Sequence, residues 1–307
     1  MRPVGPTLAI TGATGFVGST LVRHAAMRGQ AVRALTRRPQ PAMKGVRWID
    51  GALDRPDSLA QLVEGADAVI HVAGVVNAPD RAGFAAGNVE GTLAVVEAAK
   101  QAGVRRFIHV SSLAAREPDL SNYGWSKARA EQIVAASGLN WTAVRPPAVY
   151  GPGDREMLDL FRMARWGLLM LPPEGRISVI EVSDLSRLLL SLVGEDETLA
   201  EIYEADDGQP GGWTHEAFGK AIGAAVGRRR VATVATPRGV LRFAAGIDRL
   251  VRRRRAKLTA DRVSYFCHPD WTIDPARRPP AEIWRPHIET VTGLRATAIA
   301  YRAAGWL

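Results

Sequence analysis

The sequence predicts an α/β fold: a doubly wound parallel sheet followed by a smaller, discontinuous C-terminal domain. Two observations lead to this prediction. In the first half, short β-branched and apolar runs alternate with segments of helical periodicity, which is typical of βαβ units. After Tyr150 the alternation gives way to segments divided by Gly and Pro, which indicates a second kind of domain.

The composition is that of a globular protein and excludes several classes. Of the 307 residues, 47% are hydrophobic and 23% are charged, which argues against a disordered or fibrous chain. One cysteine, Cys267, allows no intrachain disulfide and no CxxC zinc spacing. No apolar run approaches the roughly 18 residues of a membrane span, and the N-terminus does not read as a signal peptide. We expect a cytoplasmic protein.

The net charge of +9 has a local source. Residues 228–257 contain eleven Arg and Lys residues and one acid, Asp248, so the remainder of the chain is close to neutral. A basic segment of this kind does not make a general nucleic-acid-binding surface, and we expect no nucleic-acid partner.

The elements follow in order along the chain. The expected strands of the first half are Thr7–Thr11, Ala31–Thr36, Val46–Asp50, Ala68–Val72, Phe107–Val110 and Trp141–Val144. The main helices between them are Gly15–Arg28, Phe84–Ala102 and Tyr123–Ser137. Later elements are a strand at Ile177–Val182, helices at Val182–Val193, Thr214–Val226 and Ile288–Ala304, and a last sheet strand at Ala200–Ala205. We therefore expect a dinucleotide-binding domain in residues 1–150, to which 177–205 return, and a small substrate domain in 151–176 and 206–307.

A glycine loop follows the first strand and opens the first helix. It reads TGATGFVG, from Thr11 to Gly18. In a Rossmann-type domain the first glycine makes the tight turn, the second lets a pyrophosphate approach the backbone, and the third allows close packing of helix and strand. The helix N-terminus then offers free N–H groups to the phosphates. The loop predicts a dinucleotide site that includes Gly12, Thr14, Gly15, Phe16, Val17 and Gly18.

The end of the second strand favours one cofactor. An Asp or Glu there binds the ribose 2′-hydroxyl of NAD, whereas Arg suits the 2′-phosphate of NADP. This strand ends in Arg37 and Arg38 and has no carboxylate. The sequence therefore favours NADP, with NAD as the alternative, unless both arginines are solvated loop charges.

Tyr123 and Lys127 lie four residues apart, on one face of an expected helix. Ser111 and Ser112 close the strand Phe107–Val110, at the edge where open α/β sheets bind ligands. An ammonium beside a phenol favours the tyrosinate, so that Tyr123 can exchange a proton with a substrate hydroxyl or carbonyl group. These residue types indicate proton transfer coupled to hydride transfer.

With these motifs the chain resembles the extended short-chain dehydrogenase/reductase superfamily, in its epimerase/dehydratase-like branch. The matching segments are TGATGFVG at 11–18, HVAG at 71–74, NVEGT at 88–92, VSS at 110–112, YGWSK at 123–127 and RPPAVYGPGD at 145–154. The resemblance implies a catalytic triad of Ser112, Tyr123 and Lys127. It also implies that the cofactor site includes Ala73, Gly74, Val75, Asn88, Pro146 and Val149. For Asn88, a purely structural role in holding a backbone group is equally open.

Two departures from the family pattern restrict the substrate and the adenine site. Where the family has a Gly-Asp-apolar triplet, this chain has Gly51-Ala52-Leu53, so the carboxylate of the triplet is missing and Asp54 comes two positions late. We keep Leu53 as a cofactor-site residue and expect adenine recognition to rest on backbone groups. Members acting on sugar nucleotides often carry an arginine at the position of Ile177; here Arg176 precedes it and would point to the other face of a strand. A nucleotide-sugar substrate is therefore disfavoured.

Three functions from different classes remain open. The first is an NADP-dependent oxidoreductase acting on a hydroxyl or carbonyl group of a non-nucleotide, hydrophobic small molecule. The second is a nucleotide-sugar epimerase or dehydratase, and the third is a non-catalytic dinucleotide-binding subunit or assembly factor. The Tyr123/Lys127 pair argues against the third, because a scaffold has no use for it.

The basic segment contains an amphipathic helix. From Val240 to Arg255, apolar residues recur at helical spacing, with most arginines off that stripe. Such a helix packs its apolar face inward, lies on an anionic membrane surface, or binds a polyanion. We keep all three interpretations, the second as a peripheral membrane contact through Val240–Lys257.

Two further expectations concern metals and assembly. The six histidines show no metal-ligand spacing, so we expect no metal site, and His71 and His109 are interpreted as hydrogen-bonded core residues. The family resemblance implies a homodimer of C2 symmetry built on the helices Phe84–Ala102 and Tyr123–Ser137. The small and apolar residues expected on their outer faces are Ala94, Val95, Ala98, Ala130, Ile133 and Val134.

Overall fold

A computed structural model of the chain describes residues 5–252 and 258–307. The chain divides into two compact units. The first runs up to Arg145 and adds Leu185–Tyr203 and Pro279–Trp284, and the second consists of Pro146–Asp184, Glu204–Arg278 and Arg285–Leu307. The sequence places 146–150, 177–184 and 204–205 with the first domain and 279–284 with the second, whereas the structure assigns each of these segments to the other unit.

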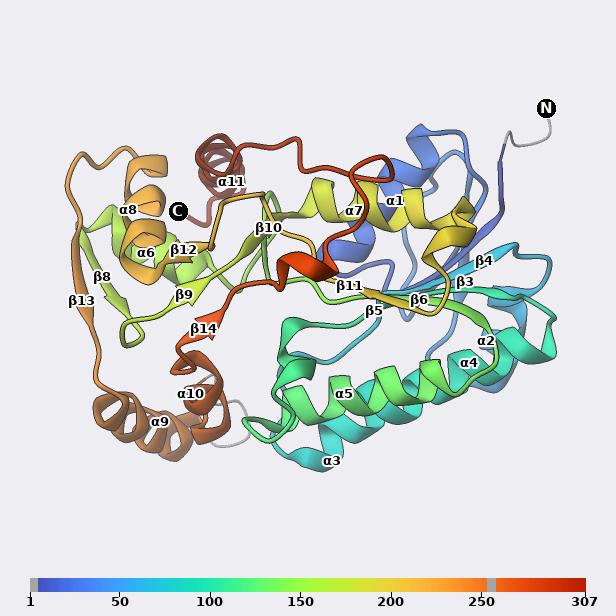
Figure 1. The fold of residues 1–307 in the computed structure, drawn as a ribbon, viewed down its shortest axis with the longest axis horizontal. Coiled ribbons are helices and arrows are strands. Elements are labelled where there is room, and N and C mark those ends of the chain that lie inside the picture. Colours follow the sequence, from blue (N-terminus) through green and yellow to red (C-terminus); the bar gives the residue numbers. More distant parts are fainter. Residues whose placement is uncertain (1–4, 253–257) are drawn as a thin grey trace. The chain divides into compact units, whose positions relative to one another are not determined.

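The first unit contains a seven-stranded parallel sheet of Rossmann type, as the sequence predicts. Its order is β11-β6-β5-β4-β1-β2-β3, and each neighbouring pair is parallel (Figure 1). The strands are β1 (Leu8–Thr11), β2 (Val32–Thr36), β3 (Val46–Asp50), β4 (Ala68–His71), β5 (Arg106–Val110), β6 (Asn140–Val144) and β11 (Glu201–Tyr203). The strand order reverses between β1 and β4, so the carboxyl ends of these two strands border the crevice in which open α/β sheets bind ligands.

Helices cover both faces of this sheet (Figure 1). They are α1 (Phe16–Met27), α2 (Pro56–Val63), α3 (Arg81–Phe84), α4 (Gly91–Gln101), α5 (Asn122–Ala135) and α7 (Val182–Ser191), with 3-10 turns η2 (Leu113–Arg116), η3 (Leu192–Gly194) and η4 (Asp196–Thr198). On one face, α2, α4 and α5 bury Leu62, Val96 and Val134 against Val69 and Phe107 of the sheet. The α1 helix and the part of α7 in the first unit lie on the other face.

The segment expected as one helix from Phe84 to Ala102 is built differently. A π-helix, η1 (Ala85–Glu90), separates α3 from α4. Wider π turns of this kind occur frequently at functional sites, and this one carries Asn88.

The second unit has three small sheets and five helices among its described residues. The sheets pair β7 (Ala148–Tyr150) with β10 (Val179–Glu181), β8 (Leu168–Leu171) with β13 (Ala232–Ala235), and β9 (Arg176–Ile177) with both β12 (Trp213–Thr214) and β14 (Asp270–Trp271). The helices are α6 (Leu158–Arg165), α8 (His215–Ala225), α9 (Arg238–Arg252), α10 (Ala260–Phe266) and α11 (Thr290–Ala303), with a 3-10 turn η6 (Pro275–Arg277). Its core gathers Phe161, Leu169, Phe218, Leu294 and Tyr301.

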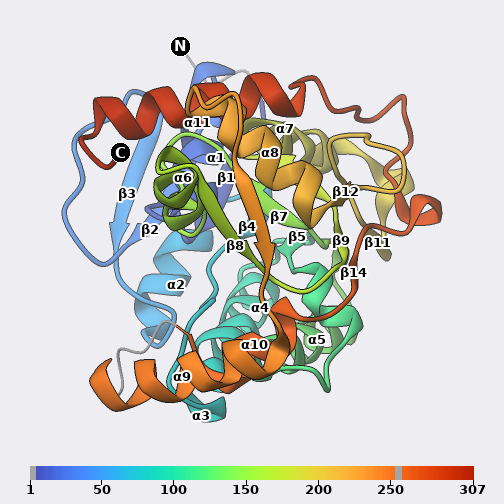
Figure 2. The same cartoon turned by 90° about the vertical axis from the view of Figure 1, so that its left-hand side faces the viewer.

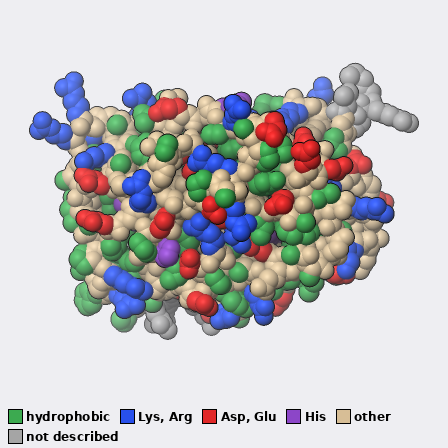
Figure 3. Space-filling view, in the orientation of Figure 1, with side chains coloured by type: hydrophobic (Ala, Val, Ile, Leu, Met, Phe, Trp, Pro, Cys, Tyr) green, Lys and Arg blue, Asp and Glu red, His purple; other side chains and the backbone are tan. Residues whose placement is uncertain are grey.

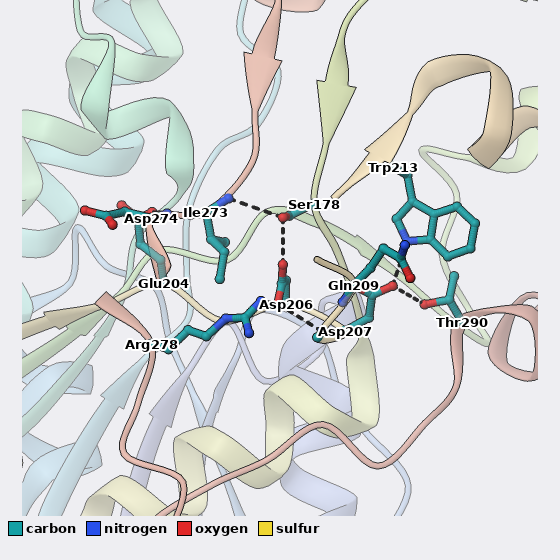
Figure 4. A network of polar contacts seen from close by, with 11 residues as sticks. Ser178, Glu204, Asp206, Asp207, Gln209, Trp213, Ile273, Asp274, Arg278 and Thr290 are labelled. Carbon is teal, nitrogen blue, oxygen red and sulfur yellow. Dashed lines mark hydrogen bonds and ion pairs between the residues drawn. The ribbon is translucent and has the colours of Figure 1, made fainter. Parts of the chain in front are cut away.

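Two carboxylates, one buried and one partly buried, hold the separate segments of the second unit together (Figure 4). Asp206 accepts hydrogen bonds from the Ser178 hydroxyl and the Arg278 guanidinium, both at 2.8 Å. Asp207 accepts from the Trp213 indole at 2.7 Å and from the Thr290 hydroxyl at 2.5 Å. The discontinuous unit is thus joined by hydrogen bonds as well as by its apolar core. None of the described helices combines the length and hydropathy needed to cross a bilayer.

Candidate active site

The glycine loop has the geometry that its sequence predicts. Gly12 has φ +67°, and a Cβ there would lie 2.6 Å from the Ala73 backbone nitrogen. A Cβ on Gly18 would lie 2.1 Å from the carbonyl oxygen of Gly12. Thr14 and Gly15 are exposed, and α1 begins directly after Gly15 at Phe16 and Val17, with no described side chain capping it. The loop therefore presents backbone N–H groups that suit a pyrophosphate.

A buried hydrogen-bond chain connects this loop to the following strand and helix. The Thr11 hydroxyl accepts from the Ala73 amide at 3.2 Å and contacts His71 Nδ1 at 2.7 Å. His71 Nε2 lies 3.0 Å from the Thr92 hydroxyl, which itself donates to the Asn88 carbonyl oxygen at 2.6 Å. Because the Thr92 hydroxyl proton is committed to Asn88, Thr92 accepts from Nε2, whereas Thr11 can donate its proton to Nδ1. The hydrogen-bond chain is therefore satisfied by neutral His71 protonated at Nε2.

Burial keeps His71 neutral: together with the charge of Lys127, it lowers the pKa of the imidazole to about 3. The expectation of a hydrogen-bonded core histidine is thus confirmed for His71. His109 differs, because within the described residues neither of its ring nitrogens has a hydrogen-bond partner. Burial also lowers its pKa well below the usual value, and its ring stacks on that of His71 with centroids 5.6 Å apart.

Asn88 fixes the loop after β4. Its Oδ1 accepts from the Val75 amide at 2.6 Å, and its Nδ2 donates to the Val75 carbonyl oxygen at 2.9 Å and to the Ser126 hydroxyl at 2.8 Å. Ser126 in turn donates to the carbonyl oxygen of Tyr123. The Asn88 side chain therefore holds the backbone of Val75, next to Ala73 and Gly74, and connects this loop to the start of α5. These contacts correspond to the purely structural role considered for Asn88.

The two serines after β5 have different environments. The Ser111 hydroxyl donates to Glu131 Oε1 at 2.5 Å, and Glu131 also forms a buried ion pair with Arg145, with 2.7 Å between Arg145 Nη2 and Glu131 Oε2. Ser112 instead begins η2, where its Oγ accepts from the Ala114 amide at 3.2 Å. A hydroxyl that accepts from an amide keeps its proton available for a ligand. The geometry favours Ser112 over Ser111 as the residue facing the substrate carbonyl.

Gly124 allows the turn that carries Ser112 to approach α5 closely. A Cβ at Gly124 would lie 2.6 Å from the Ala114 carbonyl oxygen and 2.9 Å from that of Glu117. Ser121 caps α5 through the Gly124 amide at 3.0 Å. Sequence patterns do not single out Gly124, Ser121 or Glu131, because their roles depend on contacts between elements.

Tyr123 and Lys127 lie on α5, as the spacing predicts. Tyr123 is partly exposed, with its ring 6.1 Å from that of Phe84. Lys127 is buried, and its Nζ donates to the Val110 carbonyl oxygen at 2.7 Å. Burial lowers the pKa of the ammonium to about 8, and the negative charge of Glu131 partly opposes this decrease.

Comparisons with known proteins identify the family. Residues 12–158 match the NAD(P)H-binding family. The chain is 37% identical to the ceramide reductase of Caulobacter vibrioides over 98% of its own length and 96% of the relative's. It is 29% identical to the 2-alkyl-3-oxoalkanoate reductase of Stenotrophomonas maltophilia, over 94% and 97% of the two chains. The Bordetella bronchiseptica enzyme WbmG, solved with NAD, has the same fold: the TM-score is 0.77 at 20% identity, over 100% of this chain and 97% of that one.

The chain belongs to the extended short-chain dehydrogenase/reductase superfamily. It is an NAD(P)-dependent oxidoreductase, as the sequence predicts.

Arg37 and Arg38 are exposed immediately after β2. The Thr36 hydroxyl shapes their turn by accepting from the Arg38 amide at 3.2 Å. Strand register also places exposed Asp50, at the end of β3, beside Thr36. The sequence pattern did not reveal this acid, since its proximity depends on the pairing of β2 with β3.

The remaining predicted site residues lie in two places. Leu53 is partly buried and packs on the core beneath α2 and α4, so a cofactor contact there would use its backbone. Pro146 and Val149 follow β6 in the second unit, and their cofactor contacts stay predictions. No cluster of three or more potential metal ligands occurs within residues 5–252 and 258–307.

The expectation that all six residues lie on the outer faces of the two dimer helices is wrong for three of them. Val95, Ala130 and Val134 are fully buried in their own chain, because the helical repeat turns them toward the sheet. Ala94, Ala98 and Ile133 are partly exposed and remain available to a second subunit.

Proposed function

We propose that this protein is an NADPH-dependent reductase that converts a ketone on a long-chain, lipid-like substrate into an alcohol. The observation that carries the proposal is the likeness to ceramide reductase across 98% of the chain, which includes the second unit. The likeness to 2-alkyl-3-oxoalkanoate reductase over 94% of the chain supports the same reaction class.

The proposed chemistry assigns a task to each member of the triad. A bound nicotinamide cofactor supplies the hydride for the carbonyl carbon. Ser112 donates a hydrogen bond to the carbonyl oxygen and polarises it. Tyr123 gives its phenolic proton to the same oxygen as negative charge develops there. The Lys127 ammonium, held by Val110, stabilises the resulting tyrosinate.

The charged residues at the ends of β2 and β3 support NADP over NAD as the cofactor. The glycine loop fits a dinucleotide, because the contacts at Gly12 and Gly18 leave no room for side chains between loop and strand. At the end of β2, Arg37 and Arg38 supply two guanidinium groups for a 2′-phosphate, against one carboxylate from Asp50. Together these three side chains have a net positive charge.

Cofactor choice is tested by titrating both reduced cofactors. NADPH should bind more tightly than NADH, and the double variant Arg37→Ala/Arg38→Ala should remove that preference. The matched control is Arg47→Ala, because Arg47 is also exposed but lies within β3. An unchanged preference in the double variant would contradict the assignment.

Turnover is tested separately by following NADPH absorbance with long-chain ketones. Tyr123→Phe should abolish turnover and retain cofactor binding, since only one hydroxyl is lost. Full activity of this variant would refute the triad. A nucleotide-sugar epimerase would show no net loss of NADPH, and an assembly factor would show no turnover with any substrate class.

One contact argues against the nucleotide-sugar alternative. The Arg176 side chain donates to the carbonyl oxygens of Gly211, at 2.6 Å, and Gly212, at 3.1 Å. This guanidinium is already committed to a turn of its own unit, so it is not free to hold a diphosphate.

The proposed assembly is a homodimer through α4 and α5, with Ala94, Ala98 and Ile133 at the contact. Static light scattering at micromolar concentration should give twice the chain mass of 33.1 kDa. A mass of one chain would exclude the dimer.

A further inference from the structure

Helix α9 exposes a continuous apolar stripe. Val240, Phe243, Ile247, Leu250 and Val251 are 50–81% exposed, although they recur at the spacing of one helix face. The opposite side holds the helix to its unit through Ala245, which is 4% exposed. The interpretation in which this apolar face packs inward is therefore wrong for these five residues. Arg253–Arg255 and Lys257, which the sequence assigns to the same segment, lie outside the described residues.

A second apolar surface belongs to the same unit. The paired strands β8 and β13 turn Leu169 and Leu171 inward. Leu168, Met170 and Val234 point outward and are 46–51% exposed, and Trp166, just before β8, is 77% exposed. β13 ends at Ala235 and α9 begins at Arg238, so the two surfaces adjoin. Figure 2 shows β8 and β13 facing the viewer with α9 below them.

Basic residues surround this surface. Arg228, Arg229 and Arg230 are exposed immediately before β13, and Arg242 is exposed on α9. Residues 228–252 contain seven arginines and a single acid, Asp248, whose carboxylate accepts a hydrogen bond from the Leu258 amide. In Figure 3 apolar and basic side chains lie together over α9, at the lower left. Large apolar side chains with a cationic rim are what an interfacial helix presents to anionic lipid.

We propose that this docking face, made of α9 and the outer side of β8/β13, binds the surface of an anionic lipid bilayer. Charge decides between the possible occupants: a second copy of the chain would bring another cationic rim against this one, whereas phosphate headgroups neutralise it. The apolar side chains then enter the boundary between headgroups and acyl chains. The proposal goes beyond ketone reduction, because binding requires neither cofactor nor substrate.

The test is co-sedimentation of the full chain with vesicles, without cofactor. We expect binding to vesicles containing phosphatidylglycerol, weaker binding to pure phosphatidylcholine, and release by salt. Phe243→Asp and Leu250→Asp should each reduce the partition coefficient by about tenfold or more, because each places a charge in the apolar stripe. The matched control is Ile299→Asp on α11, where an apolar side chain 63% exposed lies outside the docking face.

Two results would overturn the proposal. One is vesicle binding by Phe243→Asp and Leu250→Asp equal to that of the unaltered chain. The other is a lower mass in light scattering for these variants, which would make the face a subunit contact. Thermal unfolding and NADPH binding, measured on every variant, show that the fold is intact. A failure of membrane binding with ketone reduction preserved would leave the proposed function unaffected.

Discussion

The Lys127 ammonium donates a hydrogen bond to the carbonyl oxygen of Val110 across 2.7 Å. This contact joins the middle of α5 to the last residue of β5 and places a positive charge in a buried environment. Burial disfavours the charged form, and the pKa of Lys127 falls to about 8. Burial therefore makes the cationic partner of Tyr123 sensitive to mildly alkaline pH.

The first prediction follows from that pKa. Turnover and NADPH affinity should decline as the pH rises through about 8, because Lys127 then loses the charge that stabilises the tyrosinate. Lys127→Met should show low activity with no such pH dependence. The measurement is the pH profile of kcat and of the NADPH dissociation constant.

The same shift has a signature in stability. The folded-state pKa lies below the usual lysine value, so the folded protein bears the cost of the buried charge below pH 8 and loses that cost as pH rises toward 10.5. As the pH rises from about 8 to 10.5, the Tm of the unaltered chain should therefore rise relative to the Tm of Lys127→Met. A constant difference would contradict the buried, charged state.

The second prediction separates the two serines. Ser112→Ala should lower kcat, because its hydroxyl is assigned to the substrate, and should also cost about 0.5–2 kcal/mol of stability, the usual loss for a helix cap, because its Oγ accepts from the Ala114 amide. Ser111→Ala should retain kcat but reduce the free energy of unfolding by roughly 1.5–3 kcal/mol, the usual loss for a hydrogen bond to a charged group, here Glu131. The check is steady-state kinetics beside denaturant unfolding. The reverse pattern would move the catalytic role to Ser111.

The third prediction concerns Asn88. Replacing it with Ala removes the partners of both backbone groups of Val75 and of Ser126. Unsatisfied polar groups of this kind cost about 1–3 kcal/mol each when buried, so Tm should fall and NADPH affinity should weaken with it. Asn88→Asp, which keeps the acceptor and loses the donors, should recover only part of the loss. Calorimetry and cofactor titration measure both effects, and unchanged NADPH affinity in Asn88→Ala would limit Asn88 to a structural role.

The sequence was sufficient to predict the features that depend on local patterns, namely the strands of the first unit and the glycine loop. The parallel strands follow from alternating apolar runs, and the Gly12–Gly18 loop follows from the backbone geometry that only glycine allows. The π-helix that carries Asn88 was not predictable, because the apolar spacing from Phe84 to Ala102 fits an uninterrupted α-helix. The contacts of Asn88 with Val75 and Ser126 were not predictable either, because they join different elements. Asp50 was missed for a similar reason, since only strand register brings it beside Thr36. The exposure of the apolar face of α9 could be learned only from the structure, because an amphipathic pattern does not show which side of a helix packs against the protein.

The last prediction uses Gly18. A methyl group there would come within 2.1 Å of the Gly12 carbonyl oxygen, and that neighbour is backbone that cannot rotate away. Gly18→Ala must therefore push α1 away from β1, which we expect to cost about 1–3 kcal/mol and to weaken NADPH binding severely. The matched control is Gly246→Ala in α9, where a Cβ meets nothing within 4 Å. That variant should gain roughly 0.5–1 kcal/mol from helix propensity and keep full cofactor affinity. Both are measured by urea unfolding and NADPH titration. Normal NADPH affinity in Gly18→Ala would show that the loop tolerates a wider turn and that the cofactor does not depend on this close contact.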